Sequence, residues 1–433
     1  MQKLVNTLRS TTLTSLLVAG LASQPALAVE ANNTTDINTL KNELETLKAE
    51  IHQLKSQTEA IAEQQESNTA SSATSEKPQK TSGATLWGYG QINYTNYTNS
   101  NEKSKMDLAR AVFGIGYRFN DKTRFMSEFE IEHAISSADD EGEVEVEQFY
   151  VDHQLTRYAN MKAGLFLIPA GLLNENHEPN RFYGVERNMV ETAIIPTTWR
   201  EGGLAFYGTT ESGLAWDTGI TTTVDLSAWD ASSDEGRESP LGSIHQELQL
   251  ANADDLGVYA ALNYRGIPGL VVGGSIFTSK VSQNDPALSS NAKNIRLVLW
   301  DTHVRWTQDN WDISALYAQG RFTNTYDLNL TYVGMPTPVP EIFFGGYLQV
   351  AYKAWQNGEQ ALAPFVRYER VNTAATYTSA PLGLGAHSAN TETIGTYGLS
   401  FFLTENVVFK ADYQHYADDD SQNRFNLGIG LAF

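Results

Sequence analysis

The chain has 433 residues, a formal net charge of −21, 20 Tyr, 18 Phe, 8 Trp and no cysteine. The lack of cysteine excludes a disulfide-stabilised fold, and the acidic balance argues against nucleic-acid binding, which needs a basic surface. Many aromatic residues combined with modest overall hydrophobicity are typical of a membrane β-barrel, in which only alternate residues touch lipid.

Residues 1–28 have the pattern of a signal peptide. Lys3 and Arg9 precede an apolar core from Leu13 to Leu21, and Ala26-Leu27-Ala28 is a small-x-small cleavage site. The alternative is an N-terminal membrane anchor, which needs about 20 apolar residues. Neither this segment nor any later one reaches that length, so a membrane protein with this sequence must cross as a barrel.

Residues 29–64 carry a heptad pattern that predicts an α-helical coiled coil. One core position takes Ile37, Leu44, Ile51 and Thr58, and the other takes Leu40, Leu47, Leu54 and Ile61. The alternative is a single amphipathic helix packed on its own domain. Residues 65–83, rich in Ser, Thr and Ala, favour the coiled coil because they are typical of a flexible linker. The mixture of Ile and Leu leaves dimer and trimer open.

Residues 84–433 change to a period of two, which predicts β-strands. Phe113, Ile115 and Tyr117 alternate with polar or small residues, and the last strand alternates in the same way and stops at Phe433. A soluble sandwich with its apolar faces inward would show the same hairpins. The terminal Phe and the signal peptide favour an all-β transmembrane barrel in the outer membrane, with the coiled coil in the periplasm.

Short and long connections alternate along this region. Short connections are expected at residues 120–122, 267–269, 308–310 and 404–406, and long polar ones at 136–142, 170–199, 229–255, 281–292, 323–341, 371–389 and 417–422. Barrels of this class have short periplasmic turns and long outer loops. Counting the runs between connections predicts about 16 antiparallel strands, an even number as such barrels require.

The third outer connection, residues 170–199, is longer than a plain connection needs. Together with its flanks it resembles the phosphate-selective porin O and P family, in the strand Lys162–Leu172, in Glu186-Arg187, and in the segment Pro196–Gly208. The resemblance implies a sixteen-stranded homotrimer with this connection as the constriction. A coiled coil ahead of such a barrel is similar to related dicarboxylate-type channels, which favours a trimeric coiled coil.

The resemblance also implies that basic side chains in the lumen favour anions such as phosphate or dicarboxylates. By strand parity Arg110, Arg118, Arg124, Arg265, Lys353, Arg367, Lys410 and Arg424 should point inward, and Arg181, Glu186, Arg187 and Arg200 lie in or beside the third connection. Several acidic residues share these inner faces, so any one arginine could equally be a wall residue paired with an acid. The lysine cluster of the phosphate-selective family is not visible as a run.

The sequence therefore predicts a porin for passive diffusion of small hydrophilic solutes, with outer-membrane lipid and lipopolysaccharide as surroundings. The alternatives are an adhesion or binding protein anchored by a closed barrel, and an outer-membrane hydrolase. An enzyme is not expected, because there is no Gly-x-Ser-x-Gly elbow. No cofactor or metal is expected either, because none of the 8 His residues lies in a metal-ligand spacing. His133, His153 and His177 are candidates for a hydrolase site by location alone.

Overall fold

The computed structural model describes residues 83–136, 142–378 and 389–433, all within the unit Lys80–Phe433. The expected signal peptide (1–28), the expected coiled coil (29–64) and the expected linker (65–83), apart from Gly83, lie outside the described residues. In the described ranges, no helix combines the length and the apolar character that a membrane crossing requires.

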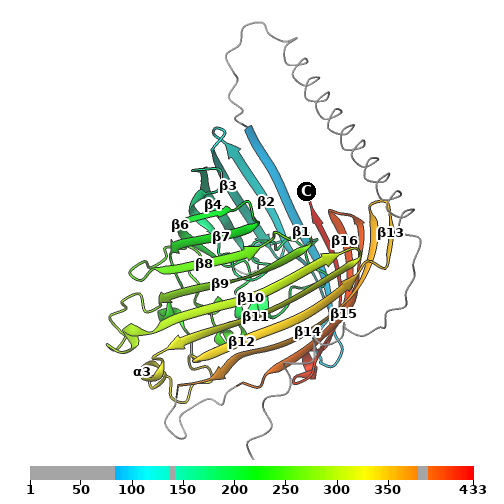
Figure 1. The fold of residues 1–433 in the computed structure, drawn as a ribbon. Helices are drawn as coiled ribbons and strands as arrows, with labels where there is room; N and C mark the ends of the chain where they lie inside the picture. The colour runs from blue at the N-terminus through cyan, green and yellow to red at the C-terminus, as the bar shows by residue number, and fades with distance from the viewer. Residues whose placement is uncertain (1–82, 137–141, 379–388) are drawn as a thin grey trace, which may run out of the picture. The chain divides into compact units, whose positions relative to one another are not determined.

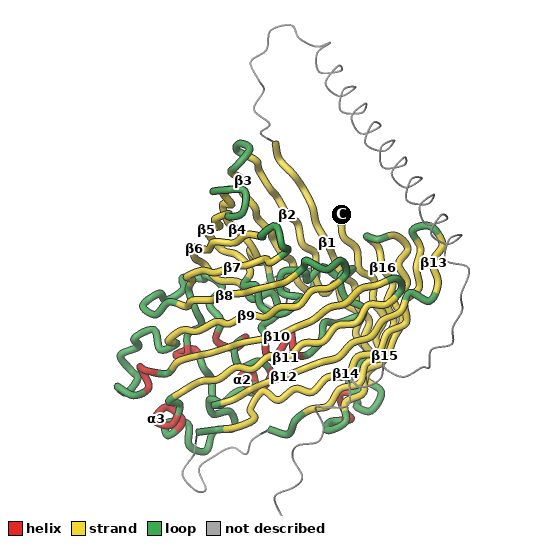
Figure 2. Tube along the Cα trace, viewed as in Figure 1, coloured by secondary structure: helices red, strands yellow, loops and turns green. Residues whose placement is uncertain are grey.

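Antiparallel strands form one continuous sheet (Figures 1 and 2). Their bounds are β1 (Gly83–Tyr97), β2 (Lys105–Arg118), β3 (Thr123–Glu132), β4 (Val144–Gln154), β5 (Asn160–Leu167), β6 (Arg200–Thr209), β7 (Leu214–Thr221), β8 (Gly257–Tyr264), β9 (Leu270–Lys280), β10 (Arg296–Gln308), β11 (Trp311–Thr323), β12 (Ile342–Tyr352), β13 (Trp355–Asn357), β14 (Gln360–Thr376), β15 (Glu392–Thr404), β16 (Val407–Tyr416) and β17 (Arg424–Ala432).

The sheet closes on itself because β1 pairs with both β2 and β17. Tyr89 lies opposite Val112 on one side and opposite Ala432 on the other. The short β13 continues β12, since both pair with β14. The described residues therefore form a closed barrel of 16 antiparallel strands, and the predicted architecture and strand number are confirmed.

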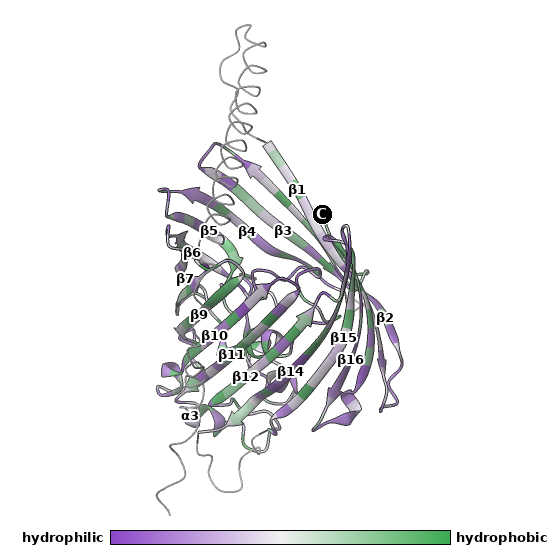
Figure 3. Ribbon diagram, turned by 45° about the vertical axis from the view of Figure 1, so that its right-hand side comes forward, coloured by the Kyte–Doolittle hydropathy of each residue, from purple (hydrophilic) through white to green (hydrophobic). Residues whose placement is uncertain are grey.

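Residues of different hydropathy alternate along the strands (Figure 3), and alternate side chains point to opposite sides of the barrel wall. On β2, Phe113 is 52% exposed and Val112 is 1% exposed; on β17, Leu427 is 43% exposed and Asn426 is fully buried. In a soluble sandwich the large apolar residues would be the buried ones. This inverted pattern matches a barrel whose outer surface contacts lipid.

Short turns and long loops alternate, as predicted. The turns at the chain-terminal end of the barrel are short, for example residues 309–310 and 405–406, and the loops at the other end are long. All the short helices of the described residues lie in these loops: η1 (Val190–Ile194), η2 (Leu226–Ala228), α2 (Glu235–Glu238), η3 (Gly242–Ile244), η4 (Ala292–Asn294), α3 (Tyr326–Asn329) and η5 (Asp420–Gln422). We call residues 168–199 loop L3 and residues 222–256 loop L4.

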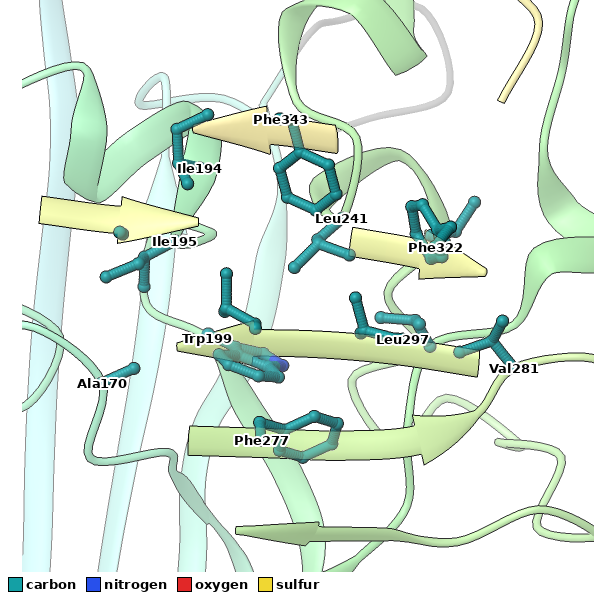
Figure 4. Close-up of a cluster of buried hydrophobic side chains, with 14 of the residues drawn as sticks. Ala170, Ile194, Ile195, Trp199, Leu241, Phe277, Val281, Leu297, Phe322 and Phe343 are labelled. Atoms are coloured by element: carbon teal, nitrogen blue, oxygen red, sulfur yellow. The ribbon is translucent and has the colours of Figure 1, made fainter. Parts of the chain in front are cut away.

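A hydrophobic core lies inside the barrel, which the sequence did not predict. Trp199 of L3 packs against Phe277 of β9, with 4.7 Å between ring centroids, and Leu241 of L4 belongs to the same cluster (Figure 4). Both Trp199 and Leu241 are almost completely buried. Burial of this apolar surface holds L3 and L4 against the inner face of β9–β12.

Candidate functional site

Loop L3 starts after β5 and contacts strands far from β5 in the barrel order. The backbone N–H of Val185 donates to Asp412 Oδ2 on β16 (2.6 Å), and that of Met189 donates to Glu369 Oε2 on β14 (2.7 Å). Gln91 of β1 donates to the Val185 carbonyl oxygen (3.0 Å). Buried charge-assisted hydrogen bonds of this kind are strong. The loop therefore passes through the inside of the barrel.

Glu191 ties the two ends of L3 to each other and to the wall. Its Oε1 accepts from the backbone N–H groups of Leu172 (2.5 Å) and Leu173 (2.7 Å), and its Oε2 accepts from Asn188 Nδ2 (2.8 Å) and the Tyr347 hydroxyl of β12 (3.0 Å). Burial raises the pKa of Glu191, and these donors act against that rise. The carboxyl group fixes the fold of the loop.

L3 lies between two polar cavities. The outer cavity, about 640 Å³, is bordered by Glu186 and Arg187 of L3 together with residues from the ends of long loops. The inner cavity, about 840 Å³, is bordered by Asn180 and Tyr183 of L3 together with residues of the short turns. Asn180 also donates to the backbone carbonyl of Glu405 in one of those turns (3.0 Å). The loop thus reaches from one end of the lumen nearly to the other.

Arginines from four segments meet at the outer cavity. These are Arg110, Arg187, Arg200 and Arg424. Arg200 pairs with Glu145 and Glu247, and Arg424 pairs with Glu186. In the described part of the chain, no carboxylate lies within 4.0 Å of Arg110 or Arg187.

The two unpaired guanidinium groups bond neutral oxygens. Arg110 donates to the His177 carbonyl oxygen (2.6 Å), and Arg187 donates to Thr198 Oγ1 (3.2 Å). Burial and the Arg110 charge lower the pKa of Arg187 to about 9, so this side chain is still charged at neutral pH.

Four further basic residues of the prediction lie either at the short-turn rim or on the wall beside L3. Arg118 and Arg124 are at the short-turn rim, where Arg124 pairs with Asp152 (2.7 Å). Arg367 and Lys410 contact L3 from the wall: Arg367 pairs with Glu369 (2.6 Å), and Lys410 donates to the Gly184 carbonyl oxygen (2.7 Å).

Three further predicted residues do not border the outer cavity. Arg265 and Lys353 lie just outside the strands, in the turns after β8 and β12, and Lys353 borders the inner cavity. Arg181 is largely exposed, 4.0 Å from Glu178. The structure therefore brings Arg110, Glu186, Arg187, Arg200 and Arg424 together at one cavity and leaves Arg118, Arg124, Arg265 and Lys353 away from it.

Sequence reasoning placed Glu130 on an inner face but missed the acids of β4 that join it beside L3. Glu130 and Glu147 face the lumen from β3 and β4, and Glu147 lies 3.8 Å from His177 of L3. Burial lowers the pKa of His177 to about 4, although Glu147 acts in the opposite direction, so its imidazole is neutral. The signal available was the alternation Val144-Glu145-Val146-Glu147, which places both acids on one face.

Comparison with solved structures places this barrel among porin folds. It is similar to Salmonella typhi OmpF in complex with daunomycin (TM-score 0.57, 14% identity, 81% of this chain and 97% of that chain). It is also similar to an anion-selective porin of Comamonas acidovorans (TM-score 0.51, 10% identity, 81% and 100%) and to the outer membrane channel DcaP of Acinetobacter baumannii (TM-score 0.50, 11% identity, 83% and 100%).

The sequence comparison is more specific. No family model matches the chain. An uncharacterized protein of Aquifex aeolicus (strain VF5) is 30% identical over 373 residues, which cover 83% of this chain and 82% of that protein. A match of this extent over most of both chains shows common descent, and the chain belongs to the same family as this Aquifex protein.

Proposed function

We propose that the protein is an outer-membrane porin through which small hydrophilic solutes diffuse passively, with L3 as its constriction. The observation that carries this proposal is the course of L3, which crosses the lumen and has a polar cavity on each side. The outward apolar rows of β2 and β17 support a position in a lipid bilayer. The apolar core lies on the β9–β12 side of the lumen, and the outer cavity, lined by residues of β1–β4 and L3, is the proposed solute path.

Anions such as phosphate or dicarboxylates are the proposed solutes. Arg110 and Arg187 have no carboxylate partner at the outer cavity in the described part of the chain, and guanidinium groups suit phosphate and carboxylate geometry. The acids Glu145, Glu186 and Glu247 are occupied by arginines. The resemblance of residues 161–208 to the phosphate-selective porin O and P family, and the name of one structural neighbour, an anion-selective porin, support an anionic solute.

A homotrimer is the proposed assembly, held in the periplasm by the heptad segment 29–64. Cross-linking of the full chain in outer-membrane vesicles should give a threefold mass. A monomer would contradict this part of the proposal and leave the channel itself standing.

Planar-bilayer recording tests the channel and its selectivity. In a KCl gradient, the wild type should give a reversal potential of the anion-selective sign. Arg187→Gln removes a unit charge, which at 4 Å is worth about 1 kcal/mol in water, or roughly a fivefold change in ion ratio. Arg181→Gln, in the same loop but largely exposed, should change little.

The alternatives predict different recordings. A barrel that serves only as the anchor of an adhesin would carry no current. A hydrolase would act on lipid and lose that activity on substitution of a histidine. A cation-selective wild type would contradict the anion proposal.

A further inference from the structure

The wall next to L3 contains an irregularity that gathers acids at one point. The pairing of β3 with β4 shifts register between Glu128 and Phe129, which is a β-bulge. Here Glu147 is the extra residue of β4, and its side chain is fully buried in the lumen wall. Donor oxygens of Glu130, Glu145 and Glu147 all lie within 4.8 Å of one another.

Two of these acids have a carboxylate oxygen that accepts no hydrogen bond in the described part of the chain. Glu130 and Glu147 are 3% and 0% exposed, and the Oε1 atom of each lacks a hydrogen-bond partner in the described part of the chain. Burying a carboxylate oxygen without a partner is costly, so a proton or a cation is required there.

The basic groups nearby do not meet this need. Arg200 bonds Glu145, and Arg110 donates to the His177 carbonyl oxygen (2.6 Å). His177 donates its Nδ1–H to the carbonyl oxygen of Asn174 (2.9 Å), and its Nε2 faces the Tyr89 hydroxyl (2.5 Å). Because a carbonyl can only accept, the neutral ring carries its lone pair on Nε2, which accepts from the Tyr89 hydroxyl, so His177 brings no charge to the acids.

We propose that Glu130, Glu145 and Glu147 bind one Ca²⁺. Calcium takes carboxylate oxygens at 2.3–2.6 Å, so its ligands can lie up to roughly 5 Å apart, which these oxygens satisfy. Glu130 and Glu145 also border the outer cavity, from which water completes the coordination shell. The ion joins β3 to β4 at the bulge, beside the point where L3 passes. This inference does not depend on the transport function.

Terbium luminescence on the full-length protein in detergent tests the site. Tb³⁺ replaces Ca²⁺ at oxygen sites, and two aromatic residues that can sensitise it lie near the cluster. The Tyr89 hydroxyl is 2.8 Å from Glu147 Oε2, and Trp87 donates to Glu128 (2.8 Å), whose carboxylate lies within 4.8 Å of that of Glu147. We expect saturable emission at one ion per chain that Ca²⁺ displaces. Glu147→Gln should weaken the binding roughly tenfold or more.

Control variants show whether the binding depends on these three acids. Glu359→Gln removes the same charge at the inner cavity and should retain the site. Glu130→Gln gives a second, independent loss, and heat-dependent gel mobility checks that each barrel is folded. If the folded wild type shows no more saturable emission than Glu147→Gln, or if Ca²⁺ fails to displace it, the calcium site is wrong. In that case a proton shared between Glu130 and Glu147 neutralises the cluster.

Discussion

Replacing Glu191 with alanine should release L3 from its fixed course without unfolding the barrel. The carboxyl group accepts four hydrogen bonds, two from backbone N–H groups at the start of the loop, one from Asn188 and one from Tyr347 of the wall. Glu191→Ala removes all four acceptor contacts at a residue that is 3% exposed. The strands keep their own ladder hydrogen bonds, so the damage is confined to the loop.

The size of the effect follows from the number of donors left without acceptors. Each buried donor that loses its acceptor costs about 1–3 kcal/mol. Water from the adjacent cavities will satisfy some of the four, so we expect the fixed position of the loop to lose about 3–5 kcal/mol. That loss is enough to populate other positions of the loop, because contacts such as Val185 to Asp412 hold only its middle.

Single-channel recording measures this loss directly. Glu191→Ala should show larger mean conductance and more current noise than the wild type. Glu191→Gln, which keeps one carbonyl oxygen, should lie between the two. Glu175→Ala removes the same charge from the same loop but breaks only a 4.0 Å contact with Lys162, and should behave like the wild type. Equal conductance and noise in Glu191→Ala and Glu175→Ala would refute the role given to L3.

Three other substitutions test separate parts of the account. Trp199→Ala removes the contact with Phe277 and should lower stability by about 3–5 kcal/mol, seen as a lower temperature of heat-modified gel migration; an unchanged temperature would mean that the inner core does not stabilise the fold. Gly345→Val would meet Val190 and Ile194, which lie 3.0–3.2 Å from an added Cβ, and should change conductance by displacing η1; a wild-type conductance would count against that packing. Lys410→Met should shift the reversal potential toward cation selectivity; an unchanged reversal potential would mean that this buried lysine does not act on the solute path.

The barrel could be predicted from the sequence because its signals are local. Strand periodicity in β2 and β17 depends only on which side of the wall each residue occupies, and the outward side of Phe113 and Leu427 is confirmed. The short turns contain residues that favour turns, such as Asp309-Asn310. The number of strands follows from these two signals and is also confirmed.

The interior could not be predicted because it depends on contacts between distant segments. Glu191 meets Tyr347 only after L3 crosses the lumen, and L4 folds inward because Trp229 and Leu241 find an apolar wall there. The bulge at Glu147 is set by the pairing of two strands rather than by either strand alone. Strand parity does not apply to Arg265, because β8 ends at Tyr264 and the sequence did not define that end.

The central claim is that alternate side chains of each strand face lipid on the outside of this barrel, while the others face the lumen and the loops folded into it. The chain has no cysteine, so single cysteines can be placed along β17 from residue 425 to residue 431 without a background. In proteoliposomes, a lipid-phase probe should reach positions 425, 427, 429 and 431 and should not reach 426, 428 and 430, which are buried on the inner side of the wall. Labelling without this period of two, or with the two sets exchanged, would contradict the account.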